Sequence, residues 1–173
     1  MKQFLTLAFL AAAFGISAAV ITPSMPFKKG SATPVEGWKL SGKAALAADG
    51  SIVLPPMSAI ELPGFFNAKA GDKVVYEIVC KYDRKDLSLR LGQWAQQGWI
   101  GENSGFIPAG KEFKTIKGEL ILTDAKTPDK AGVLRKTCRI SVKIYAHGGS
   151  SGAVVKSVKL EIIPGKASAP EKK

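Results

Sequence analysis

The feature that most constrains the fold is a strict alternation of apolar and polar residues within segments bounded by turn residues. In 73–82, the side chains of Val74, Tyr76, Ile78 and Cys80 fall on one face. The segments 134–146 and 153–163 show the same pattern. A period of two residues indicates a β-strand with one face buried and the other in water. No segment beyond the N-terminal region shows a sustained helical period, so we expect a chain built from strands.

Shorter apolar segments extend this series. Further strands are expected at 38–40, 44–46, 52–54, 58–62, 87–94 and 111–122. Asp49-Gly50 tolerates the positive φ angles of a tight hairpin turn, and Pro63-Gly64 would end the strand before it. Many short strands at fairly regular spacing predict an all-β fold, an antiparallel two-sheet sandwich of jelly-roll type.

The N-terminal segment 1–19 predicts a cleavable signal peptide. Lys2 gives a short positive region, an uncharged apolar run follows, and Ser17-Ala18-Ala19 supplies the small residues of a cleavage site. A retained membrane anchor is the alternative, because the apolar run approaches the shortest bilayer span when it is counted to Ile21. We expect an exported protein that is periplasmic, on the cell surface or extracellular. The remaining chain divides into an extended lead-in (20–35), a β-sandwich domain (36–163) and a flexible C-terminal tail (164–173).

The chain contains two cysteines. Cys80 and Cys138 both fall on apolar faces of expected strands, and in an oxidising compartment such a pair most often forms a disulfide. We therefore predict a bridge across the core. A metal site would need further ligands near these two thiols and the single His147, and the spacing offers none.

The chain is basic, with 25 Lys and Arg against 14 Asp and Glu and a net charge of +11. An exported protein does not meet nucleic acid in its normal work, so anionic glycans or acidic envelope polymers fit this charge better. Alternation places a row of cations on one polar face. The candidates for an anionic-ligand surface are Arg135, Arg139, Lys143 and, from the next strand, Lys159. A solvated lysine-rich face is the alternative.

Catalytic motifs are missing from the sequence. It contains no nucleophile elbow, no HExxH and no Gly-rich phosphate loop. Glycoside hydrolysis needs two carboxylates across a cleft, and the spacing of the Glu residues pairs none of them. We expect neither catalysis nor a metal or cofactor.

The segment 90–103 is the strongest candidate for a binding site. It holds two of the three Trp residues of the chain together with three Gln, an Asn and several Gly. Indole offers a flat apolar face with one N–H donor, while amide and guanidinium groups hydrogen-bond to hydroxyls. We therefore predict a sugar-binding set of Trp94, Trp99, Arg90, Gln93, Gln96 and Asn103, with Trp99 in a loop. A Trp that plugs the end of the sandwich, beside solvated Gln residues, remains the alternative.

Three segments, 70–78, 87–92 and 113–120, resemble the middle of jelly-roll carbohydrate-binding modules of the galactose-binding-like superfamily. The resemblance covers about residues 36–163. It implies the fold more than the ligand, and it implies a structural calcium ion whose ligands cannot be placed here. Together with the basic charge, it leaves a glycan or an anionic envelope polymer as the expected partner. We therefore predict a secreted non-catalytic carbohydrate-binding domain, with a preference for anionic glycans left open. The alternative is a structural or protein-interaction domain of the cell envelope.

Overall fold

The computed structural model describes residues 19–21, 38–82, 87–108, 110–148 and 152–165. Within these ranges the regular structure consists of strands. They are β1 (Ala19–Ile21), β2 (Lys39–Ser41), β3 (Ala45–Leu46), β4 (Ile52–Leu54), β5 (Ser58–Asn67), β6 (Lys73–Tyr82), β7 (Leu87–Ala95), β8 (Gly98–Phe106), β9 (Lys114–Ile121), β10 (Arg139–Ala146) and β11 (Ala153–Ile163).

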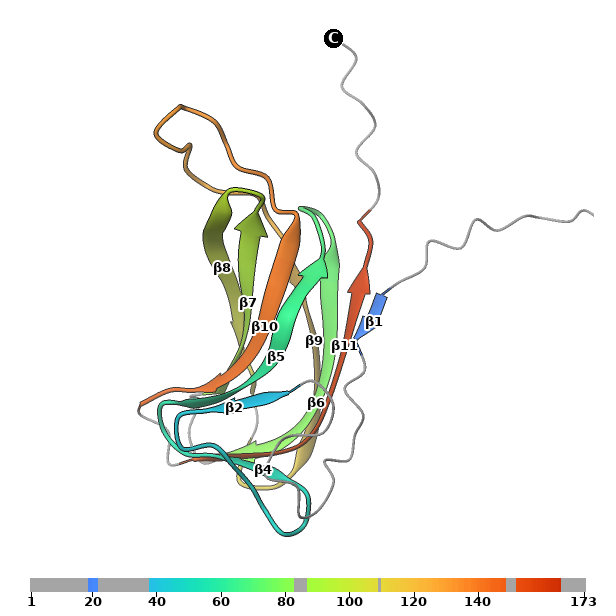
Figure 1. Ribbon diagram of the computed structural model, residues 1–173. Coiled ribbons are helices and arrows are strands. Elements are labelled where there is room, and N and C mark those ends of the chain that lie inside the picture. Colours follow the sequence, from blue (N-terminus) through green and yellow to red (C-terminus); the bar gives the residue numbers. More distant parts are fainter. Residues whose placement is uncertain (1–18, 22–37, 83–86, 109, 149–151, 166–173) are drawn as a thin grey trace, which may run out of the picture.

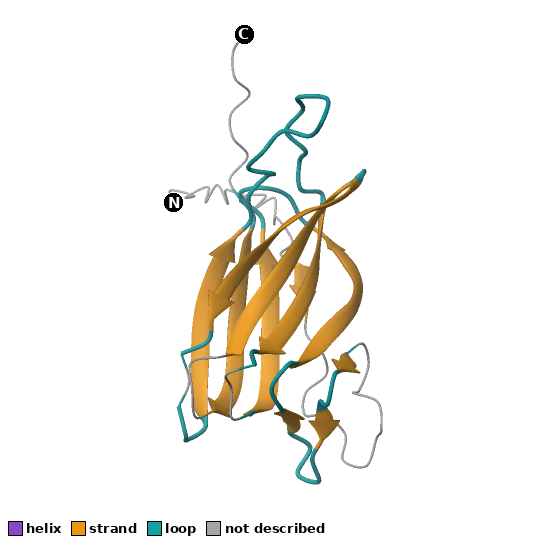
Figure 2. Cartoon of the chain, turned by 90° about the vertical axis from the view of Figure 1, so that its left-hand side faces the viewer, coloured by secondary structure: helices purple, strands orange, loops and turns teal. Residues whose placement is uncertain are grey.

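The strands form two sheets that pack face to face. Sheet I has the order β3-β4-β11-β6-β9, with β1 paired to β11, and sheet II has the order β2-β5-β10-β7-β8. Every strand pair is antiparallel. Figure 1 shows sheet II on the left and β6 and β11 of sheet I on the right, and Figure 2 views the molecule from the side of sheet II. The predicted all-β antiparallel sandwich is confirmed.

The core lies between the sheets and follows the alternation in the sequence. In β6 every second residue from Val74 to Tyr82 is buried, and β10 does the same from Ile140 to Ala146. Each fully buried Ile or Leu side chain contributes about 1.5–3 kcal/mol relative to an exposed one. Because one face of each strand is buried in the core, the opposite face is the one that can contact a ligand.

Sheet II contains two β-bulges, one in the pair β5/β10 and one in the pair β7/β8, and both affect which side chains lie on its outer face. In the pair β5/β10, Phe66 is opposite Ile140 and Leu62 is opposite Val142, so the segment 63–65 faces Ser141 alone. Gly64 has a φ of 87° there, which suits glycine. Pro63-Gly64 was expected to end the strand, but the chain bulges and continues. The bulge places Phe65 on the outer face.

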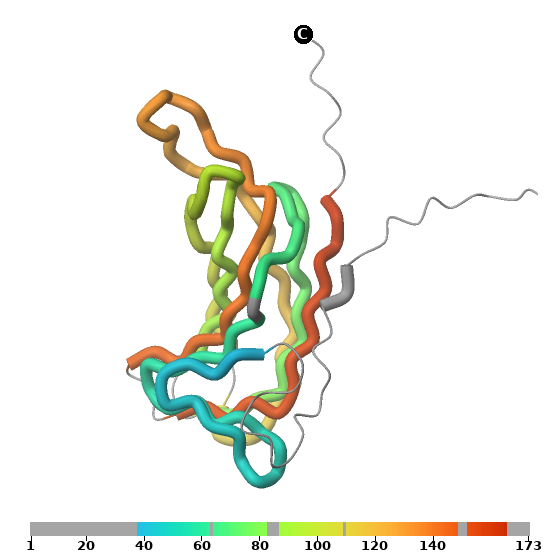
Figure 3. The backbone as a smooth tube through the Cα atoms, viewed as in Figure 1, coloured from blue at the N-terminus to red at the C-terminus, as the bar shows by residue number. Residues whose placement is uncertain are grey.

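Three strands were predicted with their observed bounds, whereas the predicted strand 134–146 starts only at Arg139. The strands β4, β6 and β11 begin and end where the sequence indicated. Gly98–Phe106 forms β8, where a loop containing Trp99 was expected. The segment 134–138 belongs to a long loop, residues 122–138, that rises past the strand ends in Figure 3.

The predicted disulfide between Cys80 and Cys138 is not present, because both thiols are free. Cys80 lies in β6 opposite Val155, near the end of sheet I that carries β4. Cys138 precedes β10 and lies at the other end of the sandwich, where its Sγ is 3.4 Å from the carbonyl oxygen of Trp94. Alternation predicted the buried side of β6 for Cys80 correctly, but it carries no information about position along a strand, and Cys138 lies outside β10.

The expected signal peptide falls almost wholly on residues 1–18, which lie outside the described residues. Ala19, the last residue assigned to it, lies in β1 opposite Ile162 of β11. The described chain contains no helix with the length and apolarity needed to span a bilayer.

Candidate functional site

The outer face of sheet II gathers aromatic and polar side chains from four strands. Figure 1 shows the lower ends of β5 and β10 bending to the left, away from sheet I, so this face is concave along the strands. Trp94 of β7, Arg139 of β10 and Trp99 of β8 share this face because Trp94 is the Cα partner of both others. A bulge between Gln93 and Trp94 in the β7/β8 pair makes this register possible.

The first group on this face is the upper cluster, defined as Phe65, Trp94, Trp99 and Arg139. Phe65 meets Trp94 edge to face, with ring centroids 5.1 Å apart and planes at 71°. The Arg139 guanidinium carbon lies 4.4 Å from the Phe65 centroid. Trp99 is 56% exposed and Phe65 is 47% exposed, whereas Trp94 is half-buried. The upper cluster therefore offers flat apolar surfaces to solvent beside a cation.

The second group is the lower cluster, defined as Arg90, Phe106, Tyr145 and His147. The Arg90 guanidinium stacks 4.3 Å from the Tyr145 ring centroid. His147 packs against Tyr145 and Phe106, with centroid distances of 4.9 Å and 5.8 Å. Its Nε2 is 3.0 Å from the Ser88 hydroxyl. These contacts hold His147 against sheet II, and its ring forms part of the aromatic surface.

Small residues separate the two clusters. Gly92 of β7 and Ser141 of β10 are Cα partners in the centre of the face. A Cβ at Gly92 would lie 2.6 Å from the Ser141 hydroxyl, so this position accepts only glycine without a shift. The Trp94 Nε1 donates to the same hydroxyl over 3.4 Å. The centre of the face is therefore low, with larger aromatic groups on either side.

Charge on this face is largely balanced within it. Lys143 Nζ lies 2.8 Å from a carboxylate oxygen of Glu61, which also accepts a hydrogen bond from Ser41. Arg90 Nε lies 3.6 Å from the Glu102 carboxylate. Both pairs are partly exposed, so each contributes about 0–1 kcal/mol to stability. Their larger effect is to fix polar groups in place at the rim of the low centre.

The structure separates the predicted sugar-binding residues into two sets. Trp94, Trp99 and Arg90 lie together on the outer face of sheet II. Gln93 points inward, is buried, and bonds the backbone of Thr123 through both its amide nitrogen and oxygen. Asn103 lies on the inner side of β8 and donates to the Ile121 carbonyl at the sheet edge, and Gln96 is exposed in the β7–β8 turn.

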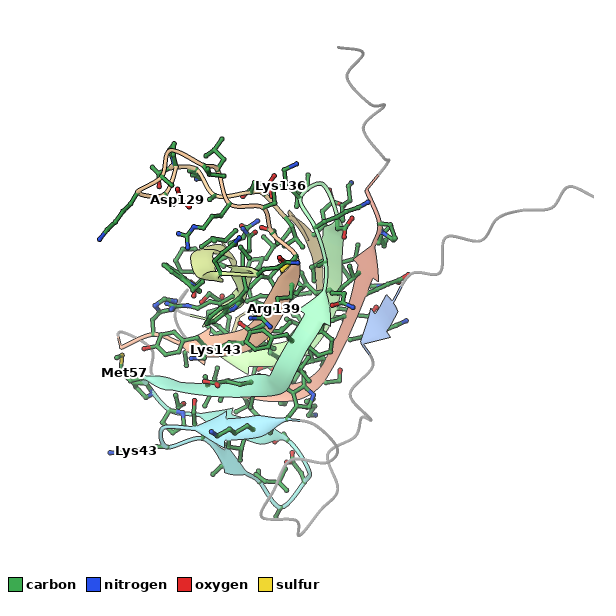
Figure 4. All side chains as sticks on the ribbon, turned by 45° about the horizontal axis from the view of Figure 1, so that its top comes forward. Lys43, Met57, Asp129, Lys136, Arg139 and Lys143 are labelled. Carbon is green, nitrogen blue, oxygen red and sulfur yellow. The ribbon has the colours of Figure 1, made fainter. Side chains whose placement is uncertain are left out.

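The predicted row of cations is also divided. Arg139 and Lys143 lie on the outer face of sheet II, and Figure 4 shows both rising from β10. Arg135 lies in the long loop and donates to the Trp99 carbonyl over 3.3 Å. The expectation that Lys159 joins them is wrong, because β11 belongs to sheet I. Consecutive strands were assumed to be neighbours, whereas β10 and β11 lie in different sheets.

The sequence interpretation missed Phe65, Phe106, Tyr145 and His147. The outward position of Tyr145 could have been predicted from the sequence, because Tyr145 continues the alternation that placed Arg139 and Lys143 on one face. Phe65 depends on the β5 bulge and Phe106 on the unexpected β8, so alternation gave no signal for either. The described residues contain no group of three or more His, Cys, Asp or Glu able to hold a metal, so the ligands of the calcium ion implied by the resemblance stay unplaced.

Comparison with known proteins adds a likeness of fold. No protein-family profile matches the sequence, and no curated protein matches it. The xylan-binding domain CBM22-1 of Paenibacillus barcinonensis Xyn10C is similar over 87% of this chain and 98% of its own, with a TM-score of 0.53 and 8% identity. The enzymatically active domain of tailspike protein 4 from bacteriophage CBA120 is similar over 83% of this chain, with a TM-score of 0.50 and 14% identity. This chain spans 22% of that tailspike domain. At sequence identities this low, the structural similarity shows a shared β-sandwich fold and nothing about function.

Proposed function

We propose that this protein binds a carbohydrate chain on the outer face of sheet II without altering it chemically. The observation that carries the proposal is the exposed upper cluster beside a low centre rimmed by polar side chains. A pyranose ring has an apolar C–H face that packs on flat aromatic rings, and hydroxyls at its edge that need hydrogen-bond partners. Trp94, Trp99 and Phe65 supply the first, and Arg90, Lys143 and Glu61 supply the second.

The likeness to a xylan-binding domain supports a carbohydrate as the ligand class. That domain and this chain share their fold over nearly the whole of both chains. A fold alone hosts many functions, so the argument rests on the face and its residues. The N-terminal sequence supports export, and we therefore place the ligand among glycans of the cell envelope, the cell surface or the surroundings.

The carboxylates of this face support binding without hydrolysis. Glu61 of β5 and Glu102 of β8 lie on strands separated by β10 and β7. Three strand spacings amount to about 14 Å. Glycoside hydrolysis places its two carboxyl groups about 5–9.5 Å apart. Each of these carboxylates is also ion-paired to a neighbouring cation, which favours a positioning role.

The test is the substitution Trp99→Ala, scored by retention on an array of neutral and acidic polysaccharides and by thermal unfolding. Trp99 is 56% exposed, so its removal should abolish retention and leave the melting temperature nearly unchanged. Ile121→Ala is the matched control, because Ile121 is 50% exposed in sheet I. That variant should bind as the parent does. Equal loss in both variants, or full retention by Trp99→Ala, would contradict the proposal.

Salt concentration separates this proposal from the alternative of an anionic polymer or protein contacted through charge alone. Exposed charges are screened over about 10 Å at 0.1 M salt, whereas stacking on aromatic rings responds little. Retention that persists at high salt and is lost in Trp99→Ala supports carbohydrate binding. Retention that disappears at high salt and survives Trp99→Ala supports the alternative.

A further inference from the structure

Arg139 differs from Arg90 and Lys143, the cations on the neighbouring positions of β7 and β10. Arg90 and Lys143 are each paired with a carboxylate of the same face, Glu102 and Glu61. No carboxylate among the described residues lies within ion-pair distance of Arg139. Its guanidinium stacks on Phe65 and its backbone is paired between Asn67 and Trp94. The upper cluster therefore holds a cation without a counter-charge.

One N–H donor of this guanidinium is also unsatisfied. Arg139 Nε is buried and has no hydrogen-bond partner within the described part of the chain. Stacking on Phe65 stabilises the positive charge but accepts no N–H bond. A guanidinium carries five donors in a fixed planar fork. Unmet donors in a partly dry place are costly, and a ligand that satisfies them gains affinity.

A carboxylate is the group that fits this environment. Its two oxygens match the guanidinium fork in a bidentate pair, and charge-assisted bonds are about twice as strong as neutral ones. The aromatic rings beside Arg139 take the sugar ring, so the carboxylate has to belong to the same sugar unit or to its immediate neighbour.

We propose that the upper cluster is a subsite for a uronic acid, with its ring on Trp94 or Trp99 and its carboxylate on Arg139. Figure 4 shows Arg139 on this face above Lys143. The proposal rests on the carbohydrate-binding function proposed above and narrows it to glycans that contain uronic acids.

The experiment compares each uronic acid polymer with its own carboxyl-reduced form, in which the acid is converted to the neutral sugar. The probes are polygalacturonate, alginate, hyaluronan and glucuronoxylan. The parent protein should bind at least one acidic polymer about tenfold or more tightly than its reduced form. Arg139→Gln should abolish that preference, so that the acidic polymer and its reduced form bind with similar affinity. Lys159→Gln, which removes the same charge from sheet I, should keep the preference.

Arg139→Lys provides the second variant, because it keeps the charge and loses the fork. The preference should fall in this variant to an intermediate level, which a purely electrostatic contribution would not produce. Equal binding of acidic and reduced polymers by the parent overturns the uronic acid subsite and leaves carbohydrate binding standing. A preference that survives in Arg139→Gln also overturns it. Failure of the parent to bind any acidic or neutral polymer overturns both proposals together.

Discussion

The two outer faces of the sandwich have similar charge pairing and different aromatic content. Sheet I carries the cross-strand pairs Lys73–Glu119 and Lys117–Glu77, both at 3.0 Å. Sheet II carries Lys143–Glu61 at 2.8 Å and Arg90–Glu102 at 3.6 Å. Among the described residues, the strands of sheet I place no aromatic side chain outward. The outer aromatic side chains of sheet II are Phe65, Trp94, Trp99, Phe106 and Tyr145.

Aromatic content, and not charge pairing, therefore sets the proposed binding face apart from the outer face of sheet I. Cross-strand ion pairs occur on both sheets, so they indicate an ordinary solvated β-surface. Exposed aromatic rings are costly in water, and sheet I avoids them. Phe113, an aromatic residue of the described chain beside β9, lies beneath the ammonium groups of Lys156 and Lys81, at 3.8 Å and 4.8 Å. On sheet II, guanidinium groups cover Phe65 and Tyr145 in the same way. Trp99 and Phe106 remain more than half exposed.

The largest difference between the two faces is expected from a pair of single substitutions, each of which removes one aromatic ring. Trp94→Ala should abolish glycan retention and lower the free energy of unfolding by about 2–3 kcal/mol, less than for a fully buried Trp. The reason is that Trp94 is half-buried, packs on Phe65 and bonds to Ser141. Phe113→Ala is the counterpart on the side of sheet I and should leave retention intact. Denaturant unfolding and glycan arrays measure the two quantities. Loss of retention in both variants would remove the distinction between the faces.

A smaller effect is expected when residues on the inner and outer sides of β7 are compared. Gln93 and Trp94 are neighbours in β7, but Gln93 points inward and fastens the long loop through Thr123. Gln93→Leu should lower the free energy of unfolding by about 1–2 kcal/mol, because both backbone groups of Thr123 lose a partner. Glycan affinity should stay within twofold by calorimetry. Gln96→Leu, in the exposed turn, should change neither. A selective loss of affinity in Gln93→Leu would return Gln93 to the binding site.

The sequence predicted strands and their buried faces correctly where apolar residues recur at every second position. The bounds of β6 and β11 were predicted correctly, whereas the predicted strand 134–146 began five residues before β10. Alternation also placed Trp94 and Arg90 on one outer face. It failed for β8, whose inward positions include Gly101, Asn103 and Gly105. These residues give no apolar signal, because Leu120 of β9 fills the space over Gly105.

What could not be predicted depends on which strands become neighbours. Neither the division of β10 and β11 between two sheets nor the distance between Cys80 and Cys138 is encoded in local periodicity. Leu134 was assigned to a strand for its apolarity, and it is more than half exposed in the long loop. The binding face combines residues from β5, β7, β8 and β10, so its composition follows from the topology, which local patterns do not determine.

A third prediction sharpens the comparison of ion pairs. Glu61→Gln on sheet II and Glu77→Gln on sheet I should each change the free energy of unfolding by less than about 1 kcal/mol, since both pairs are partly exposed. Only Glu61→Gln should alter binding. It releases Lys143 on the binding face, which should raise affinity for acidic polymers by a few fold at low salt. An equal rise in Glu77→Gln would point to net charge as the cause.

The last comparison concerns the reactivity of the two thiols, which should have the smallest effect on the protein at neutral pH. Burial raises the pKa of Cys80 to about 11, whereas Cys138 is half-buried at the end of sheet II. A thiol reagent at pH 8 should therefore label Cys138 in the native protein and both cysteines after unfolding. Labelling of neither cysteine in the unfolded, non-reduced protein would reveal a disulfide.

The raised pKa of Cys80 also predicts how stability depends on pH. Between about pH 9 and 11 the unfolded chain loses a proton that the folded protein keeps. The stabilising effect of the buried neutral thiol is therefore complete below pH 9 and declines as the pH rises towards 11. Cys80→Ala should flatten the alkaline part of the stability profile, measured by urea unfolding. Identical profiles for the parent and Cys80→Ala would mean that this thiol is more hydrated than its place between the sheets implies.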